Sequence, residues 1–167
     1  MTGPSSAPFV LAFAAEGDGR ALLRRLAAEQ LGVAPEEVPL EQRCPDCGGP
    51  HGRPAIRGSG LHVSLSRCPG GAVAVAVWGR AIGVDVEPRE LPAARLDAIR
   101  TVAGGEGVAH WTRVEAVLKA DGRGLRVDPR AVRIRGGLAT IADEPARYRL
   151  LEPDIRPDLH VTVALAL

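Results

Sequence analysis

The chain has 167 residues, of which 46% are apolar and 25% charged, so it is long enough for one sizeable core or two small subdomains that share one. Its formal net charge of +1 argues against a strongly basic surface for nucleic acid, and we expect no nucleic-acid partner. Three cysteines are too few, and odd in number, for a disulfide framework, which indicates a reducing compartment. We therefore expect a cytoplasmic globular protein.

The first half of the chain predicts a strand, a helix and then three more strands. Residues 9–14 form an apolar run without a preceding basic segment, which favours a buried strand over a signal peptide. Asp18 can cap a helix over residues 19–31. Residues 33–60 are rich in Pro, Gly and Arg, as binding loops are, with one strand expected near 38–43. Further strands are predicted at 61–66, 72–78 and 81–87; none of the apolar runs is long enough to span a bilayer, so we expect no membrane partner.

The second half repeats this order. Helices are predicted at 93–102 and 107–120, and a β-meander follows at 131–135, 138–142, 147–151 and 160–167. Strand, helix and strands therefore occur twice, which predicts an α+β fold of two similar halves, residues 1–81 and 82–167. Two such halves in one chain favour a monomer.

The charges are unevenly distributed. Residues 47–84 contain no acidic residue, yet they hold Arg53, Arg57, Arg67, Arg80, His51 and His62. This segment is either a solvated arginine-rich face or a site that receives an anion.

Two acidic residues follow directly after this segment. Asp85 and Glu87 are two apart on a predicted strand, so their side chains point to the same face while Val84 and Val86 enter the core. Two adjacent carboxylates suit Mg²⁺, which binds one or two of them together with substrate phosphate oxygens. The alternative is two solvent-facing positions of an amphipathic strand.

A third acidic residue lies four positions before the single lysine of the chain. Glu115 and Lys119 are four apart on a predicted helix and share one face, with Trp111 one turn earlier. A surface ion pair would explain this spacing and would contribute only about 0.3–0.5 kcal/mol. In a metal site, the glutamate can serve as a ligand or general base, and the ammonium can neutralise a departing phosphate.

These motifs together resemble the signature of Sfp-type 4′-phosphopantetheinyl transferases. The resemblance runs in order from about residue 44 to 125, roughly half the chain, and is most specific in its two acidic motifs. Its elements are Gly52-Arg53-Pro54, Val63 to Cys68, Gly83-Val84-Asp85-Val86-Glu87, and the helical set Trp111, Thr112, Glu115, Ala116, Lys119, Gly122, Gly124 and Leu125.

The resemblance implies a fold of two pseudo-symmetric halves, each a small, mostly antiparallel sheet packed on a helix, with the active site in the cleft between them. Such enzymes use Mg²⁺ and coenzyme A to place a phosphopantetheine arm on a serine of an acyl or peptidyl carrier protein, releasing 3′,5′-ADP. By position, Asp85, Glu87 and Glu115 would bind the metal, Glu115 would activate the serine, and Lys119 would stabilise the leaving phosphate. Arg53, Ser66 and Arg67 would hold the 3′-phosphoadenosine end.

The chain departs from the family pattern at two positions. Arg67 stands where the family usually has histidine, and arginine can still bind a phosphate. Val114 stands where a lysine commonly precedes the helical glutamate; Arg113 is adjacent but points about 100° away on a helix. A degenerate member that binds coenzyme A or a carrier protein without catalysis is therefore one alternative. A metal-dependent nuclease or phosphohydrolase is another.

A separate motif combines two cysteines and a histidine. Cys44, Cys47 and His51 have the spacing of zinc ligands, and Cys68 or His62 would complete a four-ligand structural site. Because a second Cys-x-x-Cys pair is missing, loop thiols without a metal are the alternative.

Overall fold

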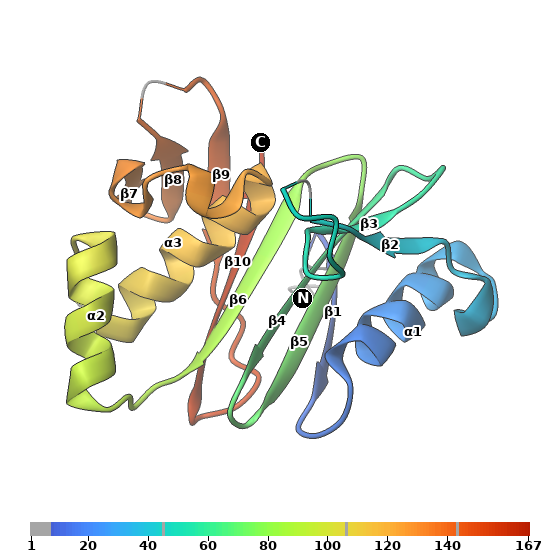
Figure 1. Cartoon of the computed structure of the whole chain (residues 1–167), viewed down its shortest axis with the longest axis horizontal. Coiled ribbons are helices and arrows are strands. Elements are labelled where there is room, and N and C mark those ends of the chain that lie inside the picture. Colours follow the sequence, from blue (N-terminus) through green and yellow to red (C-terminus); the bar gives the residue numbers. More distant parts are fainter. Residues whose placement is uncertain (1–7, 45, 106, 143) are drawn as a thin grey trace, which may run out of the picture.

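The computed structural model describes residues 8–44, 46–105, 107–142 and 144–167, which form three helices, ten strands and three short 3₁₀ segments within those ranges (Figure 1). The elements are, in chain order, β1 (Val10–Ala14), α1 (Gly19–Leu31), η1 (Pro35–Glu37), β2 (Leu40–Gln42), β3 (Pro54–Ile56), β4 (Leu61–Cys68), β5 (Gly71–Trp78), β6 (Ile82–Pro88), α2 (Ala93–Ala103), α3 (Gly107–Asp121), η2 (Gly124–Arg126), η3 (Pro129–Ala131), β7 (Val132–Arg135), β8 (Leu138–Ile141), β9 (Arg147–Leu151) and β10 (Leu159–Ala166). Their strands pair antiparallel, which confirms the α+β class.

The N-terminal sheet has the order β1-β5-β4 and packs on α1. The Asp18 side chain caps α1 by accepting a hydrogen bond from the Arg20 N–H, as predicted, and the helix ends before Gly32. Leu22, Leu23 and Leu26 on α1 pack against the even-numbered alanines of β5. Small residues on this strand allow the helix to lie close to the sheet.

The C-terminal sheet has the order β6-β10-β9-β8-β7, so the predicted meander is confirmed and β6 adds to its edge. Helix α3 packs on this sheet, with Val114, Val117 and Leu118 buried against residues of β7, β8, β9 and β10. The strands of this sheet all come from residues after 81, whereas those of the other two sheets come from residues before 79. A pseudo-symmetry between the two parts stays a prediction.

A third cluster of apolar side chains joins the two large sheets. Odd-numbered valines of β5 meet Val84 and Val86 of β6 and the apolar residues of β10. Val84 and Val86 therefore enter the core, as the alternation on this strand predicted. The backbone N–H of Val84 donates to the Ser64 hydroxyl of β4 at 3.1 Å, which fixes the junction of the sheets.

Gly83 sets the distance between β6 and α3. A Cβ atom at this position would lie 2.0 Å from the Ala116 carbonyl oxygen and 2.4 Å from the Ala120 nitrogen. Only glycine therefore permits the helix to lie this close to the strand. The face of β6 that carries Gly83 also carries Asp85 and Glu87, since side chains two apart share a face. This close packing places the acidic residues beside the helix that carries Glu115 and Lys119.

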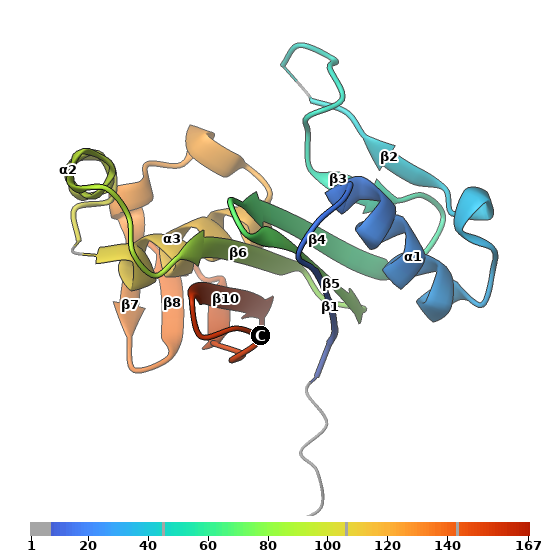
Figure 2. The same ribbon diagram turned by 90° about the horizontal axis from the view of Figure 1, so that it is seen from below.

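The region between α1 and β4 departs most from the prediction. Strand β2 pairs with β3, which was not predicted, and Figure 2 shows this hairpin and its loop rising on the same side of the central strands as α1. Strand β4 also continues through Cys68, beyond the predicted end at residue 66, so Arg67 lies in the strand. The reason is the register, in which Arg67 pairs with Ala72 and Cys68 with Gly71.

Within the described ranges, no helix combines the length and apolar character that crossing a bilayer requires.

Candidate functional site

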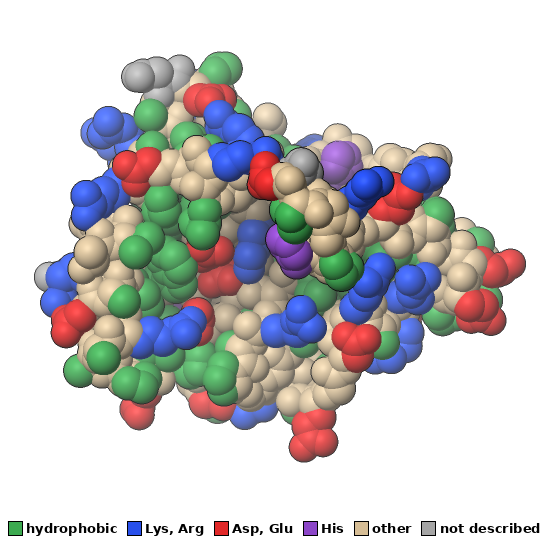
Figure 3. Space-filling view, viewed as in Figure 1, with side chains coloured by type: hydrophobic (Ala, Val, Ile, Leu, Met, Phe, Trp, Pro, Cys, Tyr) green, Lys and Arg blue, Asp and Glu red, His purple; other side chains and the backbone are tan. Residues whose placement is uncertain are grey.

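A cavity of about 510 Å³ lies between the two large sheets and the β2–β3 loop. Figure 3 shows a hollow in this region where acidic and basic side chains meet. Both parts of the chain contribute to its lining, which suits a site that holds a ligand of considerable size. The lining residues are Gln42, Cys44, Asp46, His51, Gly52, Arg53, Pro54, Ser64, Leu65, Ser66, Arg67, Asp85, Leu118, Lys119, Gly122, Arg123, Gly124 and Arg126.

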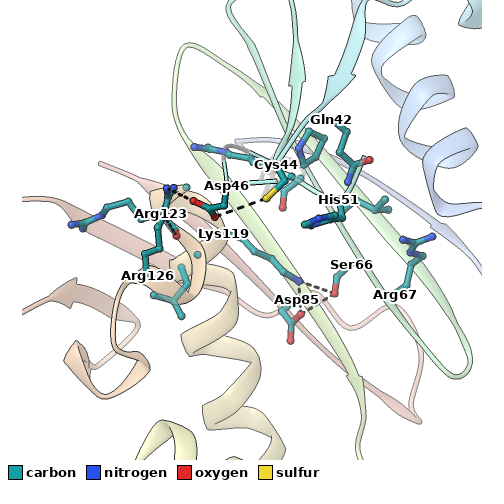
Figure 4. A pocket seen from close by; sticks show the side chains of 18 residues that line it. Gln42, Cys44, Asp46, His51, Ser66, Arg67, Asp85, Lys119, Arg123 and Arg126 are labelled. Carbon is teal, nitrogen blue, oxygen red and sulfur yellow. Dashed lines mark hydrogen bonds and ion pairs between the residues drawn. The ribbon is translucent and has the colours of Figure 1, made fainter. Parts of the chain in front are cut away.

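Lys119, Asp85 and Ser66 form a hydrogen-bonded triangle at the floor of this cavity (Figure 4). The Lys119 Nζ donates to Asp85 Oδ1 at 2.7 Å and to Ser66 Oγ at 3.0 Å, and the Ser66 hydroxyl donates to Asp85 Oδ1 at 2.8 Å. The lysine thus pairs across to β6. The structure gives it no ion pair with Glu115 among the described residues, so the helical ion pair is not the explanation of this spacing.

Asp85 keeps one carboxylate oxygen without a partner. Its side chain is 7% exposed, and Oδ2 is buried and accepts no hydrogen bond within the described part of the chain. A buried, unsatisfied carboxylate oxygen is costly unless a cation or donor occupies the space beside it. The geometry is therefore suited to a bound cation at Oδ2.

Glu87 lies on the same strand face and is 8% exposed, but it has a different partner. Its Oε1 accepts a hydrogen bond at 2.6 Å from Arg95 of α2. The two carboxylates of β6 are therefore stabilised by cations from different helices. Glu87 is the less available of the two for a metal.

Glu115 lies on α3 next to this group. Burial raises the pKa of its carboxyl above the ordinary value; the Lys119 charge acts in the opposite direction, and the charges of Asp85 and Glu87 raise the pKa further. A glutamate with a raised pKa is a stronger proton acceptor near neutral pH. Among the described residues, however, the three acidic groups do not bring their oxygens within 4.8 Å of one another. A shared cation would have to draw them together.

The two arginines predicted to bind the nucleotide end both line the cavity. A Cβ atom on Gly122, just after α3, would lie 2.3 Å from Arg53 Nη1. The Arg53 guanidinium therefore packs against the C-terminal end of α3. The Arg67 stem packs against Gly19 at the start of α1, 2.8 Å from where a Cβ would stand. Arg53 therefore lies beside the end of α3, and Arg67 beside the start of α1.

Of the other cations of the acid-free segment, His51 also lines the cavity, whereas Arg57, Arg80 and His62 do not. Arg57 pairs with Glu41 at the surface, and Arg80 lines a separate, smaller cavity. His62 also lines another cavity, and burial, with the nearby Arg53 charge, lowers its pKa. The cations of this segment are therefore distributed among this cavity, smaller cavities and the surface.

The structure accounts for the valine at the lysine position of the family. Val114 is 0% exposed and packs in the core of the C-terminal part, so a lysine here would be buried among apolar side chains. Arg113 does not replace it, since its Nε donates to Glu152 Oε1 at 2.6 Å, outside the cavity.

Three charged residues of the lining were missed by the sequence prediction: Asp46, Arg123 and Arg126. Arg123 pairs with Asp121 at 2.7 Å, and Arg126 lies 3.6 Å from Asp46 of the β2–β3 loop. The sequence signal that could have indicated Arg123 and Arg126 was their position beside Gly122 and Gly124, because this glycine pair ends α3 at the cavity.

Cys44, Cys47 and His51 come together in the β2–β3 loop. Figure 4 shows Cys44 and His51 of this group on the opposite wall of the cavity from Asp85. Their ligand atoms lie within 4.8 Å of one another, and Cys47 Sγ is 2.9 Å from His51 Nε2. Neither Cys68 nor His62 belongs to the cluster among the described residues, so a fourth ligand from either stays a prediction. Both lie on β4, where strand pairing holds them.

No family model and no curated protein matches the chain.

Proposed function

We propose that the chain is an Mg²⁺-dependent 4′-phosphopantetheinyl transferase. The observation that carries this proposal is the floor of the cavity, where Lys119 bonds Asp85 Oδ1 while the buried Oδ2 stays free for a cation. A carboxylate with an unpartnered oxygen, a lysine and a half-buried glutamate near a large cavity are groups that phosphoryl transfer can use. A cytoplasmic location and a monomeric state belong to the same proposal.

The residues fit Mg²⁺, which prefers carboxylate oxygens and keeps several waters. Asp85 would hold the ion through Oδ2, and Glu115 and Glu87 would complete the protein ligands, Glu87 after loosening its bond to Arg95. When bound, the ion supplies charge neutralisation for the pyrophosphate of coenzyme A.

Glu115 acts as the general base. The carrier serine oxygen attacks the phosphorus that bears the pantetheine arm, its proton passes to the Glu115 carboxylate, and the bond from that phosphorus to the 3′,5′-ADP oxygen breaks. Partial burial of Glu115 is useful here, because the raised pKa brings its proton affinity closer to that required near neutral pH.

Lys119 neutralises the departing 3′,5′-ADP phosphate. Its ammonium is already oriented by Asp85 and Ser66, so little reorganisation is needed as charge develops. Ser66 thereby positions the lysine; its hydroxyl is occupied by these two bonds, and a direct contact with the nucleotide stays a prediction. Removing Ser66 would therefore affect rate through Lys119.

The arginines bind the other end of coenzyme A. Arg53 and Arg67 both line the cavity, and arginine can engage a phosphate through two parallel N–H bonds. They are the groups proposed to hold the 3′-phosphate and adenosine. The loss of the family histidine at position 67 thus leaves phosphate binding intact.

Mass spectrometry of an apo carrier protein tests the proposal. Carriers from fatty-acid, polyketide and peptide synthases are incubated separately with the chain, coenzyme A and Mg²⁺. A mass gain of one phosphopantetheine that disappears with Glu115→Gln supports transfer. Coenzyme A binding without a gain on any carrier identifies a non-catalytic binder, and Mg²⁺-dependent cleavage of DNA, RNA or a phosphate ester identifies the third alternative; both overturn the proposal.

A further inference from the structure

The loop between β2 and β3 brings together a second set of ligand atoms that phosphopantetheine transfer does not use. Cys44 and Cys47 are free thiols, and the latter is exposed. Cys47 Sγ lies 2.9 Å from His51 Nε2, and all three ligand atoms are within 4.8 Å of one another. Two sulfurs and an imidazole nitrogen are the donor set that favours zinc over Mg²⁺.

The spacing of these atoms is close to that of a metal site. In a tetrahedral zinc site, with bonds of about 2.3 Å to sulfur and about 2.0 Å to nitrogen, a sulfur and a nitrogen lie roughly 3.5 Å apart and two sulfurs roughly 3.8 Å apart. The Cys47–His51 contact would therefore open by roughly 0.6 Å to admit the ion. Side-chain rotation in an exposed loop provides a change of this size.

The backbone of the loop is folded around the same atoms. The Cys44 N–H donates to the Gly49 carbonyl at 2.8 Å and the Gly48 N–H to the Cys44 carbonyl at 2.9 Å, which closes a tight turn between the two cysteines. The Gly49 N–H also donates to Cys47 Sγ at 3.4 Å. Backbone donors of this kind orient a thiolate and stabilise its charge, as the outer hydrogen bonds of metal sites do.

Gly49 shows how closely the ligands surround this turn. A Cβ atom on Gly49 would lie 3.0 Å from His51 Cδ2, 3.2 Å from its Nε2 and 3.3 Å from Cys47 Sγ. The imidazole and the thiol therefore pack against one face of the turn. The absence of a side chain at position 49 allows both to reach the same point.

We propose that Cys44, Cys47 and His51 bind one Zn²⁺ ion, with water at the fourth position. Asp46 is the nearest acidic alternative, since its Oδ2 lies 3.9 Å from Cys44 Sγ, but its other oxygen faces Arg126 at 3.6 Å. Two thiolates balance the charge of the ion, so the site requires no third anion. The inference is independent of the proposed transfer reaction.

The ion would organise the wall of the cavity. Cys44 and His51 both line it, and Arg53 follows His51 by two residues. Zinc bound at this point links the start of the loop to the residues just before β3. It withdraws His51 from any role with a phosphate and leaves Arg53 as the anion-binding group of this wall.

Metal analysis of the full chain, purified under reducing conditions, tests the inference. We expect about one zinc per chain, and stoichiometric zinc should be lost in Cys47→Ser and in His51→Gln while Cys68→Ser, the matched cysteine control, retains it. Asp46→Asn should retain it too. A reduced, folded wild-type chain without zinc would overturn the site, and loss of zinc in Asp46→Asn would overturn the water at the fourth position.

Two measurements on the wild type keep the test independent of variant folding. Replacing zinc with Co²⁺ should give a sulfur-to-cobalt charge-transfer band and the visible spectrum of tetrahedral Co²⁺. Hydrogen exchange at the Cys44 and Gly48 amides should accelerate when a chelator removes the ion, because the turn loses its anchor. A spectrum without sulfur ligation, a Cys44–Cys47 disulfide in place of bound metal, or exchange that zinc does not change would contradict the inference.

Discussion

The two candidate metal sites hold their ligand groups in opposite ways. In the carboxylate site, Asp85 and Glu115 come from a strand and a helix that pack closely through Gly83; Asp85 is buried and Glu115 is half-buried. On the loop, Cys44, Cys47 and His51 come from a stretch of eight residues and are mainly exposed. The carboxylates are held apart while the loop ligands already converge.

This difference has a physical reason. Buried carboxylates repel one another without a cation, so each takes a separate partner: Lys119 for Asp85 and Arg95 for Glu87. Neutral thiols and an imidazole can meet without such repulsion. A site for an exchangeable Mg²⁺–substrate complex and a site for a resident zinc are therefore expected to differ in this way.

The largest effect on the transfer rate is expected at the carboxylate site. Glu115→Gln removes the general base and a metal ligand, and should lower the transfer rate by about 10²- to 10⁴-fold. Glu152→Gln, a glutamate paired with Arg113 outside the cavity, is the matched control and should retain activity. Initial rates from mass spectrometry, with circular dichroism to confirm folding, measure both; equal rates for the two variants would remove Glu115 from the mechanism.

Metal affinity distinguishes the two candidate metal sites directly. Asp85→Asn should weaken Mn²⁺ binding, used as a paramagnetic substitute for Mg²⁺, by about tenfold or more, because it removes the charge at the unpartnered Oδ2. Cys47→Ser should leave this affinity unchanged while abolishing zinc binding. Electron paramagnetic resonance of free Mn²⁺ provides the titration, and an Asp85→Asn curve identical to that of the wild type would contradict a cation site there.

Gly83 tests whether close packing holds the floor together. Gly83→Ala would place a methyl group against the backbone of α3, and should lower the free energy of unfolding by about 1–3 kcal/mol. Gly60→Ala is the control, since a Cβ there meets only an ordinary contact with Trp78 at 4.0 Å. Urea denaturation of both variants gives the comparison; an unchanged midpoint for Gly83→Ala would contradict the close packing.

The smallest effect is on stability and concerns an ion pair outside both candidate metal sites. The Arg113 hydrogen bond lowers the pKa of the Glu152 carboxyl, so the pair contributes stability above the carboxyl's ordinary pKa and loses it as pH falls through the depressed value. The side chains are 36% and 40% exposed, so solvent screening limits the contribution to about 0.5 kcal/mol. Glu152→Gln should therefore be slightly less stable than the wild type at neutral pH, and thermal melts should converge in acid.

Hydrophobic periodicity predicted most elements of this fold. Helix α1 was predicted over its observed residues, and the strands of the C-terminal meander to within one or two, because their apolar alternation is regular. Strand β3 was missed because it is short and begins with Pro54, which pairs with Gln42 twelve positions earlier. Short pairings of this kind leave no periodic pattern.

Most of the predicted site residues line the cavity, whereas Glu87 and Glu115 are not among its lining residues, and the contacts among the site residues were not predicted. Spacing placed Asp85 and Glu87 on one strand face and Glu115 and Lys119 on one helix face, but the bond from Lys119 to Asp85 of β6 was not predicted. The bond between Glu87 and Arg95, and the burial of Val114, likewise depend on tertiary packing. A single sequence does not encode such distances locally.

The central claim is tested most directly by measuring both products of one reaction. The wild-type chain is incubated with coenzyme A, Mg²⁺ and an apo carrier protein, and 3′,5′-ADP is quantified by chromatography alongside the modified carrier. The proposed chemistry predicts equal amounts of 3′,5′-ADP and of carrier bearing phosphopantetheine on one serine, with neither product formed when Mg²⁺ is withheld. An unmodified carrier of every class, with the chain folded and coenzyme A intact, would contradict it.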